Sequence, residues 1–440
     1  MKRLLLLVFL LSISNISSQE KELKLSLKEA IDYAIKNSYN TKVAKNDIEA
    51  AIKRKWETTA TGLPQISGQL DYINNLKQQF PGVDFNQDGT IDFGAKHSVT
   101  GTITLNQQIF DGSYLVGLQA AKTFLKISEQ AKEKTELATR EAIINAYGNV
   151  LVSEESIKIL NRNKVVNDRL LKGARVGYEN GLTDLETVEQ FEITEGNIIT
   201  SIRNAERLTD IAYQLLNLSL GNPINTRLLL TDTLDELVEA NTDLNLLSQS
   251  FNLNDHIDYK IAENNRESSR LLLKLEKSKA LPRVTTFVNF SYIGNSDSFS
   301  FFKTSQLWVP TSVFGAGLSI PIFSSLERSA KTEQAKIALA SDDIRLEETR
   351  QRLNLQADQA RSNYILSIEN FRTAKKNLDL AQRIENKQKI KFDEGVTTSF
   401  DLLQARNQLY AQQNTYLQSM LNIIANKATL ENALNIPLNN

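Results

Sequence analysis

Four segments of this chain alternate hydrophobic and polar residues over about ten positions each, which is the period of a β-strand with one apolar and one polar face. In the first segment Ile66, Leu70 and Tyr72 share the apolar face, and Gln69 and Asp71 lie on the other. The apolar faces of the other segments are Val99, Gly101, Ile103 and Leu105; then Val284, Val288, Phe290 and Tyr292, with Phe287 out of pattern; then Phe314, Ala316, Leu318, Ile320 and Ile322. Such strands suit a transmembrane β-barrel, and they suit a half-buried sheet of a soluble protein equally well.

After each pair of strand-like segments, the pattern changes to the alternating three- and four-residue spacing of a packed helical seam. One seam consists of Leu353, Ala357, Ala360, Tyr364, Ser367, Phe371, Ala374, Leu378 and Ala381. In the first half of the chain a very long helix is expected from Gly112 to Tyr178, followed by a glycine turn and a shorter helix from Leu182 to Asn217. Another amphipathic helix is expected from Leu27 to Thr58, with Ser26 and Glu29 as a capping box.

The whole layout occurs twice. Tyr178-Glu-Asn-Gly181-Leu-Thr183 recurs 214 residues later (395 − 181) as Phe392-Asp-Glu-Gly395-Val-Thr397. The same offset takes the first seven seam positions to Thr139, Ile143, Ala146, Val150, Ser153, Ile157 and Leu160. The sequence therefore predicts a tandem duplication of a domain-sized unit, with repeats at residues 20–235 and 236–440.

The first residues have the pattern of an export signal. Lys2 and Arg3 precede the apolar run Leu4 to Leu11, and small polar residues follow through Ser18. The run is too short to span a bilayer. We therefore expect residues 1–19 to be a signal peptide.

Composition excludes several kinds of function. The formal net charge of −1 gives no reason to expect a nucleic-acid partner. Because the chain contains no cysteine, it has neither disulfides, nor thiolate metal sites, nor the N-terminal cysteine of a lipoprotein. His97 and His256 are isolated in the sequence, and no glycine-rich phosphate loop is present. We expect no cofactor and no enzymatic activity.

If the strands lie in a membrane, one chain is not sufficient. An open sheet of four strands would leave the backbone groups of its edges unpaired in hydrocarbon. Two chains would give eight strands and an interior filled by side chains, whereas three chains give twelve strands and room for a lumen. On the barrel interpretation the sequence predicts a homotrimer.

Several segments carry a family resemblance. The opening Leu25-Ser-Leu-Lys-Glu-Ala30-Ile-Asp-Tyr-Ala34, the later Leu63-Pro64-Gln-Ile66, the junction Gln108-Ile109-Phe110-Asp111 and the two glycine turns resemble the TolC family of outer-membrane efflux proteins. The resemblance implies a mainly α fold with a small β part: four strands, one third of a trimeric twelve-stranded outer-membrane β-barrel, and long antiparallel helices of a periplasmic α-barrel.

The resemblance also implies a function and partners. The chain would be a passive exit duct in the outer membrane of a Gram-negative bacterium, extending into the periplasm and contacting outer-membrane lipid. It would serve tripartite efflux or type I secretion, recruited by a periplasmic adaptor and an inner-membrane pump of the RND or ABC type.

Specific residues acquire roles through this resemblance. The adaptor-docking tips would be Gly181, Leu182 and Thr183, and Gly395, Val396 and Thr397. Asp401 would form the periplasmic pore constriction, where three carboxylates near an axis attract cations, and Gln404 stands at a partner position that is acidic in the family. The turn in the first repeat is expected to be one residue shorter, with Glu186 or Thr187 opposite Asp401. Without the resemblance, each glycine is a left-handed helix terminus followed by a hydroxyl N-cap, and Asp401 is a solvated acid at a helix start.

Two further features keep alternative interpretations. Asp84, Asn86, Asp88 and Asp92, with Gly89, have the spacing of a calcium loop, but Ala95 stands where the bidentate glutamate belongs, so a polar surface turn is the other interpretation. The aromatic residues Phe299, Phe301, Phe302 and Trp308 mark a membrane interface or only pack a loop. As whole-protein alternatives to an exit duct, the sequence allows a secreted or periplasmic helical scaffold and a stand-alone porin.

Overall fold

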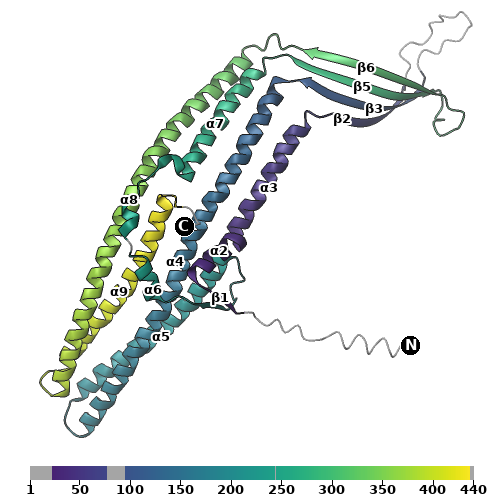
Figure 1. Ribbon diagram of the computed structural model, residues 1–440. Coiled ribbons are helices and arrows are strands. Elements are labelled where there is room, and N and C mark those ends of the chain that lie inside the picture. The colour runs from purple at the N-terminus through teal and green to yellow at the C-terminus, as the bar shows by residue number, and fades with distance from the viewer. Residues whose placement is uncertain (1–21, 77–94, 243, 437–440) are drawn as a thin grey trace, which may run out of the picture. The chain divides into compact units, whose positions relative to one another are not determined.

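The computed structural model describes residues 22–76, 95–242 and 244–436. The predicted signal peptide lies outside this range, as do the calcium candidates Asp84, Asn86, Asp88 and Asp92. Figure 1 shows the order of elements. The helices are α2 (Leu27–Asn37), α3 (Tyr39–Ala60), α4 (Gly112–Glu179), α5 (Leu185–Leu220), α6 (Leu234–Ala240), α7 (Ile257–Ser278), α8 (Glu327–Asp393) and α9 (Ser399–Ala433), with short 3-10 turns at Leu244–Ser248 and Leu253–Asp255. The strands are β1 (Leu23–Leu25), β2 (Gln65–Asn74), β3 (His97–Phe110), β4 (Leu228–Leu230), β5 (Arg283–Ser296) and β6 (Trp308–Ser319).

The chain divides into two compact units. Unit 1 comprises the residues up to 46, residues 130–260 and those from 349 onwards, and unit 2 comprises residues 47–129 and 261–348. Each unit therefore combines segments from both halves of the sequence. None of the helices in the described part of the chain has the length and hydropathy needed to cross a bilayer.

Unit 2 contains one antiparallel sheet with the strand order β2-β3-β5-β6. The register aligns the apolar alternation of the four strands, because Leu70 pairs with Gly101 and Gly101 with Tyr292. Phe287, which broke the predicted alternation, belongs to the polar face. Its ring lies over Gly315 on the neighbouring strand, where a Cβ would approach the ring to 2.3 Å. An aromatic ring covering a strand glycine in this way is a recognised means of packing a sheet.

The fourth strand is shorter than predicted. Ile320 and Ile322 were expected on its apolar face, but β6 ends at Ser319, which pairs with Arg283, the first residue of β5. Beyond that pair the neighbouring strand has already ended, and Pro321 has no backbone N–H to donate. The prediction for these two residues is therefore wrong.

The first predicted helix is interrupted. Instead of one helix from Leu27 to Thr58, α2 ends at Asn37 and α3 begins at Tyr39, with Ser38 in an extended conformation between them. The left-handed turn at Gly221 (φ +81°) lies so close to this break that a Cβ would come within 2.2 Å of the Asn37 carbonyl oxygen. The break therefore makes room for the end of α5. The capping box of Ser26 and Glu29 is confirmed.

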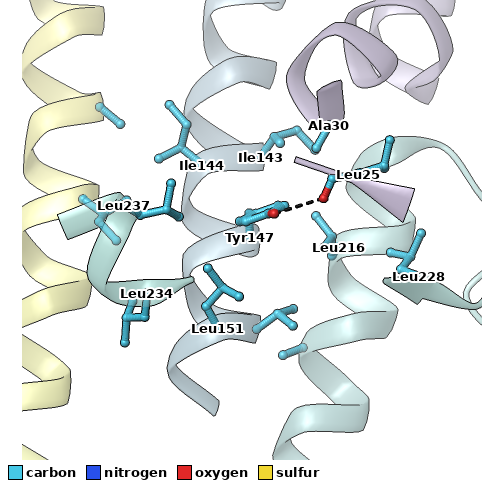
Figure 2. Packing of buried hydrophobic residues seen from close by; sticks show 14 of the residues in the cluster. Leu25, Ala30, Ile143, Ile144, Tyr147, Leu151, Leu216, Leu228, Leu234 and Leu237 are labelled. Atoms are coloured by element: carbon cyan, nitrogen blue, oxygen red, sulfur yellow. Dashed lines mark hydrogen bonds between the residues drawn. The ribbon is translucent and has the colours of Figure 1, made fainter. Parts of the chain in front are cut away.

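Unit 1 has its largest core where α2, α4, α5, α6 and α9 meet (Figure 2). Tyr147 of α4 is fully buried, and its hydroxyl oxygen lies 3.0 Å from both the Leu25 carbonyl oxygen and Asp232 Oδ2, which share its one donated proton. Burial raises the pKa of Tyr147, so this hydroxyl stays a donor at all physiological pH values. Asp232 also accepts the backbone N–H of Leu27 at 2.6 Å. These bonds join the start of α2 to α4 and to the segment before α6.

Both predicted helical seams are confirmed. In α8, the seam residues Leu353, Ala357, Ala360, Tyr364, Ser367, Ala374 and Ala381 are buried, and Phe371 and Leu378 are half-buried. In α4, Thr139, Ile143 and Val150 are buried, and Ala146, Ser153, Ile157 and Leu160 are half-buried. The long helices run as expected from Gly112 to Glu179 and, in the second repeat, from Glu327 to Asp393.

Candidate functional site: the tips of two helical hairpins

The helices α4 and α5 form a first hairpin, and α8 and α9 form a second. Their connections, residues 180–184 and 394–398, are called here the first tip and the second tip. In the first tip, Gly181 N donates to the Tyr178 carbonyl at 3.0 Å and Leu182 N to the Gly177 carbonyl at 2.7 Å. In the second tip, Gly395 and Val396 repeat both bonds at 3.0 and 2.8 Å. This pair of bonds is the Schellman motif, which satisfies the last carbonyls of a helix.

Conformation, rather than space, requires glycine at both tips. Gly181 and Gly395 have φ values of +73° and +71°, in the left-handed region that costs other residues free energy. A Cβ added to either glycine would meet no described atom within 4 Å. The expectation of a left-handed glycine at the end of each long helix is confirmed.

Each tip exposes an apolar side chain. Leu182 and Val396 are 83% and 74% exposed. In a Schellman motif the residue after the glycine commonly packs on the third or fourth residue from the helix end. The third residue is Gly177 in the first hairpin and Lys391 in the second, and the apolar fourth residue of each helix end is itself exposed. The two side chains are therefore available to a partner, and their role in adaptor docking stays a prediction.

The two hairpins use different residues at the start of their second helices, α5 and α9. Asp184 Oδ1 accepts the N–H of Thr187 at 2.9 Å, whereas Thr398 Oγ1 accepts the N–H of Asp401 at 3.2 Å. The cap is thus a carboxylate in the first repeat and a hydroxyl in the second, so the expectation of two hydroxyl caps is wrong for the first. The expected shorter first turn is also wrong, because both tips have five residues. Thr187 is the true counterpart of Asp401 (401 − 187 = 214).

A hydrogen-bond chain links the two hairpins close to the tips. Thr187 Oγ1 donates to Ser399 Oγ at 3.0 Å, and Ser399 Oγ donates to Gln190 Oε1 at 3.0 Å. Beneath this chain, Leu170, Leu171, Ala174, Val188, Phe191, Leu402 and Leu403 form one apolar cluster from both hairpins. The rings of Phe191 and Phe392 meet edge to face within it, with centroids 6.1 Å apart. The ends of the two hairpins therefore pack as one body.

Asp401 is engaged in capping its own helix. Its Oδ2 accepts the hydroxyls of Thr398 at 2.8 Å and Thr397 at 2.9 Å. These bonds, the Thr398 bond most of all, lower the pKa of the Asp401 carboxyl. Gln404, one turn further on, is exposed. The interpretation of Asp401 as a helix-start acid is confirmed, and its role at a pore constriction, which needs sister chains, stays a prediction.

A buried charge that sequence reasoning missed lies further along the hairpins. Arg406 of α9 is 2% exposed, and its Nη2 donates to the Tyr410 hydroxyl at 2.6 Å. Its Nε lies 3.9 Å from Oε1 of Glu385, which is also buried, and its Nη1 lies 3.5 Å from Asn167 Oδ1 of α4. Arg406 lies in the buried apolar stripe that Leu402, Ala405 and Leu409 form on α9. A charged residue in such a stripe is unusual, and this signal could have identified the buried arginine from the sequence.

Arg406 and Glu385 also border a cavity of about 1060 Å³ in unit 1. Its walls come from α4, α8, α9 and residues 230–235. Burial raises the pKa of Tyr410, which keeps its hydroxyl neutral beside the guanidinium. Acidic and basic residues line the cavity in equal numbers, so its walls carry no net charge.

Comparison with known proteins agrees with this architecture. The family model described as "Outer membrane efflux protein" matches the chain twice, over residues 30–222 and 253–435. The chain belongs to the outer membrane efflux protein family. Among curated relatives, this family member is similar to outer membrane protein TolC of Vibrio cholerae, with 20% identity over 362 residues, which cover 82% of this chain and 80% of that protein.

Solved structures of other channels share the fold of this efflux protein. CusC superposes with a TM-score of 0.74 at 16% identity, covering 96% of this chain and 94% of the other. The CmeC outer membrane channel of Campylobacter jejuni gives 0.74 at 16% identity, covering 93% and 85%. VceC of Vibrio cholerae gives 0.72 at 15% identity, covering 93% and 95%. The predicted fold class, mainly helical with a small sheet, is confirmed. Because these relatives are outer-membrane efflux channels, the expectation that the chain is not an enzyme is also confirmed.

Proposed function

We propose that this efflux-family chain is one third of a homotrimeric exit duct in the outer membrane, reaching into the periplasm and completed by a periplasmic adaptor and an inner-membrane pump. The observation that carries the proposal is the sheet of unit 2. Its strands β2 and β6 are edge strands, and large apolar side chains such as Leu70 and Phe314 are 76% and 73% exposed. Exposed edges and an exposed apolar face together are a liability in water.

A closed cylinder of three chains removes both liabilities. The β2 edge of one copy would pair with the β6 edge of the next, so that twelve strands form one barrel without edges. The apolar face would then meet lipid, and the face with Thr100, Thr102, Thr104, Asn289 and Ser291 would line a polar lumen. A stand-alone porin would have the same barrel, but it would not need two helical hairpins of this length.

The adaptor would dock at the tips. Leu182 and Val396 are the apolar side chains that the two tips leave exposed, and each is held by a rigid Schellman turn. To test this, a photo-crosslinking amino acid is placed at Leu182 or, as a control, at Glu206, which is exposed on the side of α5. We expect the Leu182 probe, and not the Glu206 probe, to capture a periplasmic adaptor in intact cells. Equal capture at both positions would contradict tip docking.

The hydrogen-bond chain from Thr187 through Ser399 to Gln190 would hold the hairpins together in the resting duct. Opening for export would require these bonds to break while the hairpins separate. Asp401 and Gln404 would lie at the narrowest point, where the Asp401 carboxylates of three chains would favour cations. Conductance of the purified trimer in planar bilayers tests this part of the proposal. We expect a small conductance from the resting duct, whereas an ungated porin would show a large conductance without a pump.

A further inference from the structure

The apolar face of the sheet ends in a group of aromatic side chains. Tyr72 and His97 both belong to this face, since Tyr72 pairs with Val99 and His97 lies two residues before Val99 on β3. The Tyr72 hydroxyl and His97 Nδ1 lie 2.9 Å apart, and the two rings are stacked with centroids 6.0 Å apart. Trp308 joins them from β6: it pairs with Gly294, where a Cβ would come within 2.9 Å of the indole ring.

The loop between β5 and β6 adds its own aromatic residues to this group. Phe301 is 8% exposed, and its ring lies 6.3 Å from Tyr72, 6.2 Å from Trp308 and 5.6 Å from Phe299. The Phe301 ring therefore fixes the loop onto the apolar face. This end of the sheet is the one opposite the ends where the strands connect to the helices (Figure 1).

Hydrogen bonds hold the loop in this shape. The hydroxyls of Ser296 and Ser300 are 2.8 Å apart, and the Ser300 hydroxyl donates to Gln306 Oε1 at 2.9 Å. Gln306 Nε2 in turn donates to the Asn295 carbonyl at 3.1 Å. These bonds join the loop to itself and to the end of β5.

This fixed loop nevertheless presents aromatic rings outward. Phe302 is 91% exposed and Phe299 is 60% exposed, and the exposed cation Lys303 follows Phe302 directly. Phenylalanine rings beside a lysine suit a lipid surface, because the apolar rings enter the boundary of the acyl chains while the ammonium group stays with the headgroups. The patch is also continuous, through Tyr72, with the face that the proposed barrel turns to lipid.

We propose that residues 297–307 form a membrane-interface anchor, in which Phe299 and Phe302 enter the lipid surface around the outer end of the barrel. The partner is the lipid surface itself, and Lys303 lies at the level of the anionic headgroups. This inference rests on the proposed function, because it requires the sheet to lie in a bilayer.

Spin labelling tests the anchor, because the chain contains no native cysteine. Single variants Phe302→Cys, Ser305→Cys and Leu70→Cys are labelled with a nitroxide in vesicles of phosphatidylethanolamine and phosphatidylglycerol. Ser305 is the control, an exposed polar residue of the same loop, and Leu70 reports on the sheet face. All three side chains are exposed, so labelling leaves the fold undisturbed.

We expect the Phe302 label to collide with dissolved oxygen more than with a water-soluble nickel chelate, at a depth between those of the Leu70 and Ser305 labels. A Phe302 label as accessible to the chelate as the Ser305 label overturns the anchor. Short-range spin coupling among three Phe302 labels also overturns it, since the loops would then meet one another. If the Leu70 label too lies in water, it is the barrel proposal that fails.

Discussion

Thr187 of the first hairpin donates a hydrogen bond to Ser399 of the second, with 3.0 Å between their hydroxyl oxygens. The bond ties together two segments that are 212 residues apart in the chain, just above the tips where an adaptor would dock. Ser399 in turn donates a hydrogen bond to Gln190, so its side chain makes two hydrogen bonds to the first hairpin. In a trimer this link would occur three times around the pore.

Removing the link should loosen the resting duct. Ser399→Ala deletes both of its hydrogen bonds, and a single such bond contributes about 0.5–1.5 kcal/mol, or about a two- to tenfold change in an equilibrium. We expect more frequent opening of the purified trimer in planar bilayers. Ser201→Ala is the control, because Ser201 is exposed and its hydroxyl bonds only to Asn197 of the preceding turn. Unchanged conductance of the Ser399 variant would show that the link does not restrain opening.

Replacing glycine by alanine should change local stability in opposite directions at a tip and inside a helix. Gly395→Ala should destabilise the tip by about 1 kcal/mol, since alanine is strained at positive φ. Gly196→Ala should stabilise α5 by about 0.5–1 kcal/mol, since Gly196 lies inside the helix with open space around it. Hydrogen exchange of the backbone amides near each site measures both effects. The same sign of change at both sites would contradict the role assigned to Gly395.

The ionisation of the Asp401 carboxyl predicts how cation selectivity depends on pH. Hydrogen bonds from Thr398 and Thr397 lower the pKa of Asp401 below its ordinary value of 3.8. A lowered folded-state pKa means that the stabilisation is complete above the unfolded-state pKa and is lost as the pH falls through the folded-state value. The same lowered pKa keeps the carboxyl ionised, so the cation selectivity of the trimer should be constant from neutral pH down to about pH 5 and decline only in stronger acid.

Substitution distinguishes the contribution of Asp401 to cation selectivity from that of the other capping acid, Asp184. Asp401→Asn should reduce cation selectivity at neutral pH, because it removes the charge at the proposed constriction. Asp184→Asn is the matched control: Asp184 is also a capping acid with a lowered pKa, held by Thr187, but it occupies the position of Thr398. Equal loss of selectivity in the two variants would place the constriction at the level of both caps rather than at Asp401.

The buried pair of Arg406 and Glu385 should matter more than any exposed pair. Glu385→Leu leaves the guanidinium buried without its carboxylate, and breaking a buried pair costs about 3–5 kcal/mol. The double variant with Arg406→Met should recover much of that loss, since well-packed apolar residues often replace such a pair. The exposed pair of Arg175 and Glu192, 2.8 Å apart, is the control, with an expected cost below about 1 kcal/mol. Chemical denaturation of both cycles, each with the wild type, two single variants and the double variant, would reveal non-additivity only for the buried pair.

The sequence predicted those parts of the fold that repeat a local pattern. The heptad spacing located the seam from Leu353 to Ala381, and the glycine spacing located both tips, because each depends on neighbours along the same helix. The sequence did not predict the break at Ser38, because the break depends on the close approach of Gly221, which is distant in sequence. Arg406 was missed for a similar reason: its partners Asn167 and Glu385 come from two other helices. The counterpart of Asp401 could have been predicted, because the repeat offset of 214 residues leads to Thr187, and the equal lengths of the two tips agree with it.

The central claim is that three copies share one barrel in the outer membrane, and electron cryo-microscopy of the mature protein extracted from that membrane tests it most directly. We predict a threefold particle in which the β2 edge of each copy pairs with the β6 edge of its neighbour, and in which an uninterrupted belt of bound lipid or detergent surrounds the barrel. A single chain recovered from the periplasm without detergent, with both sheet edges free in water, would contradict the claim.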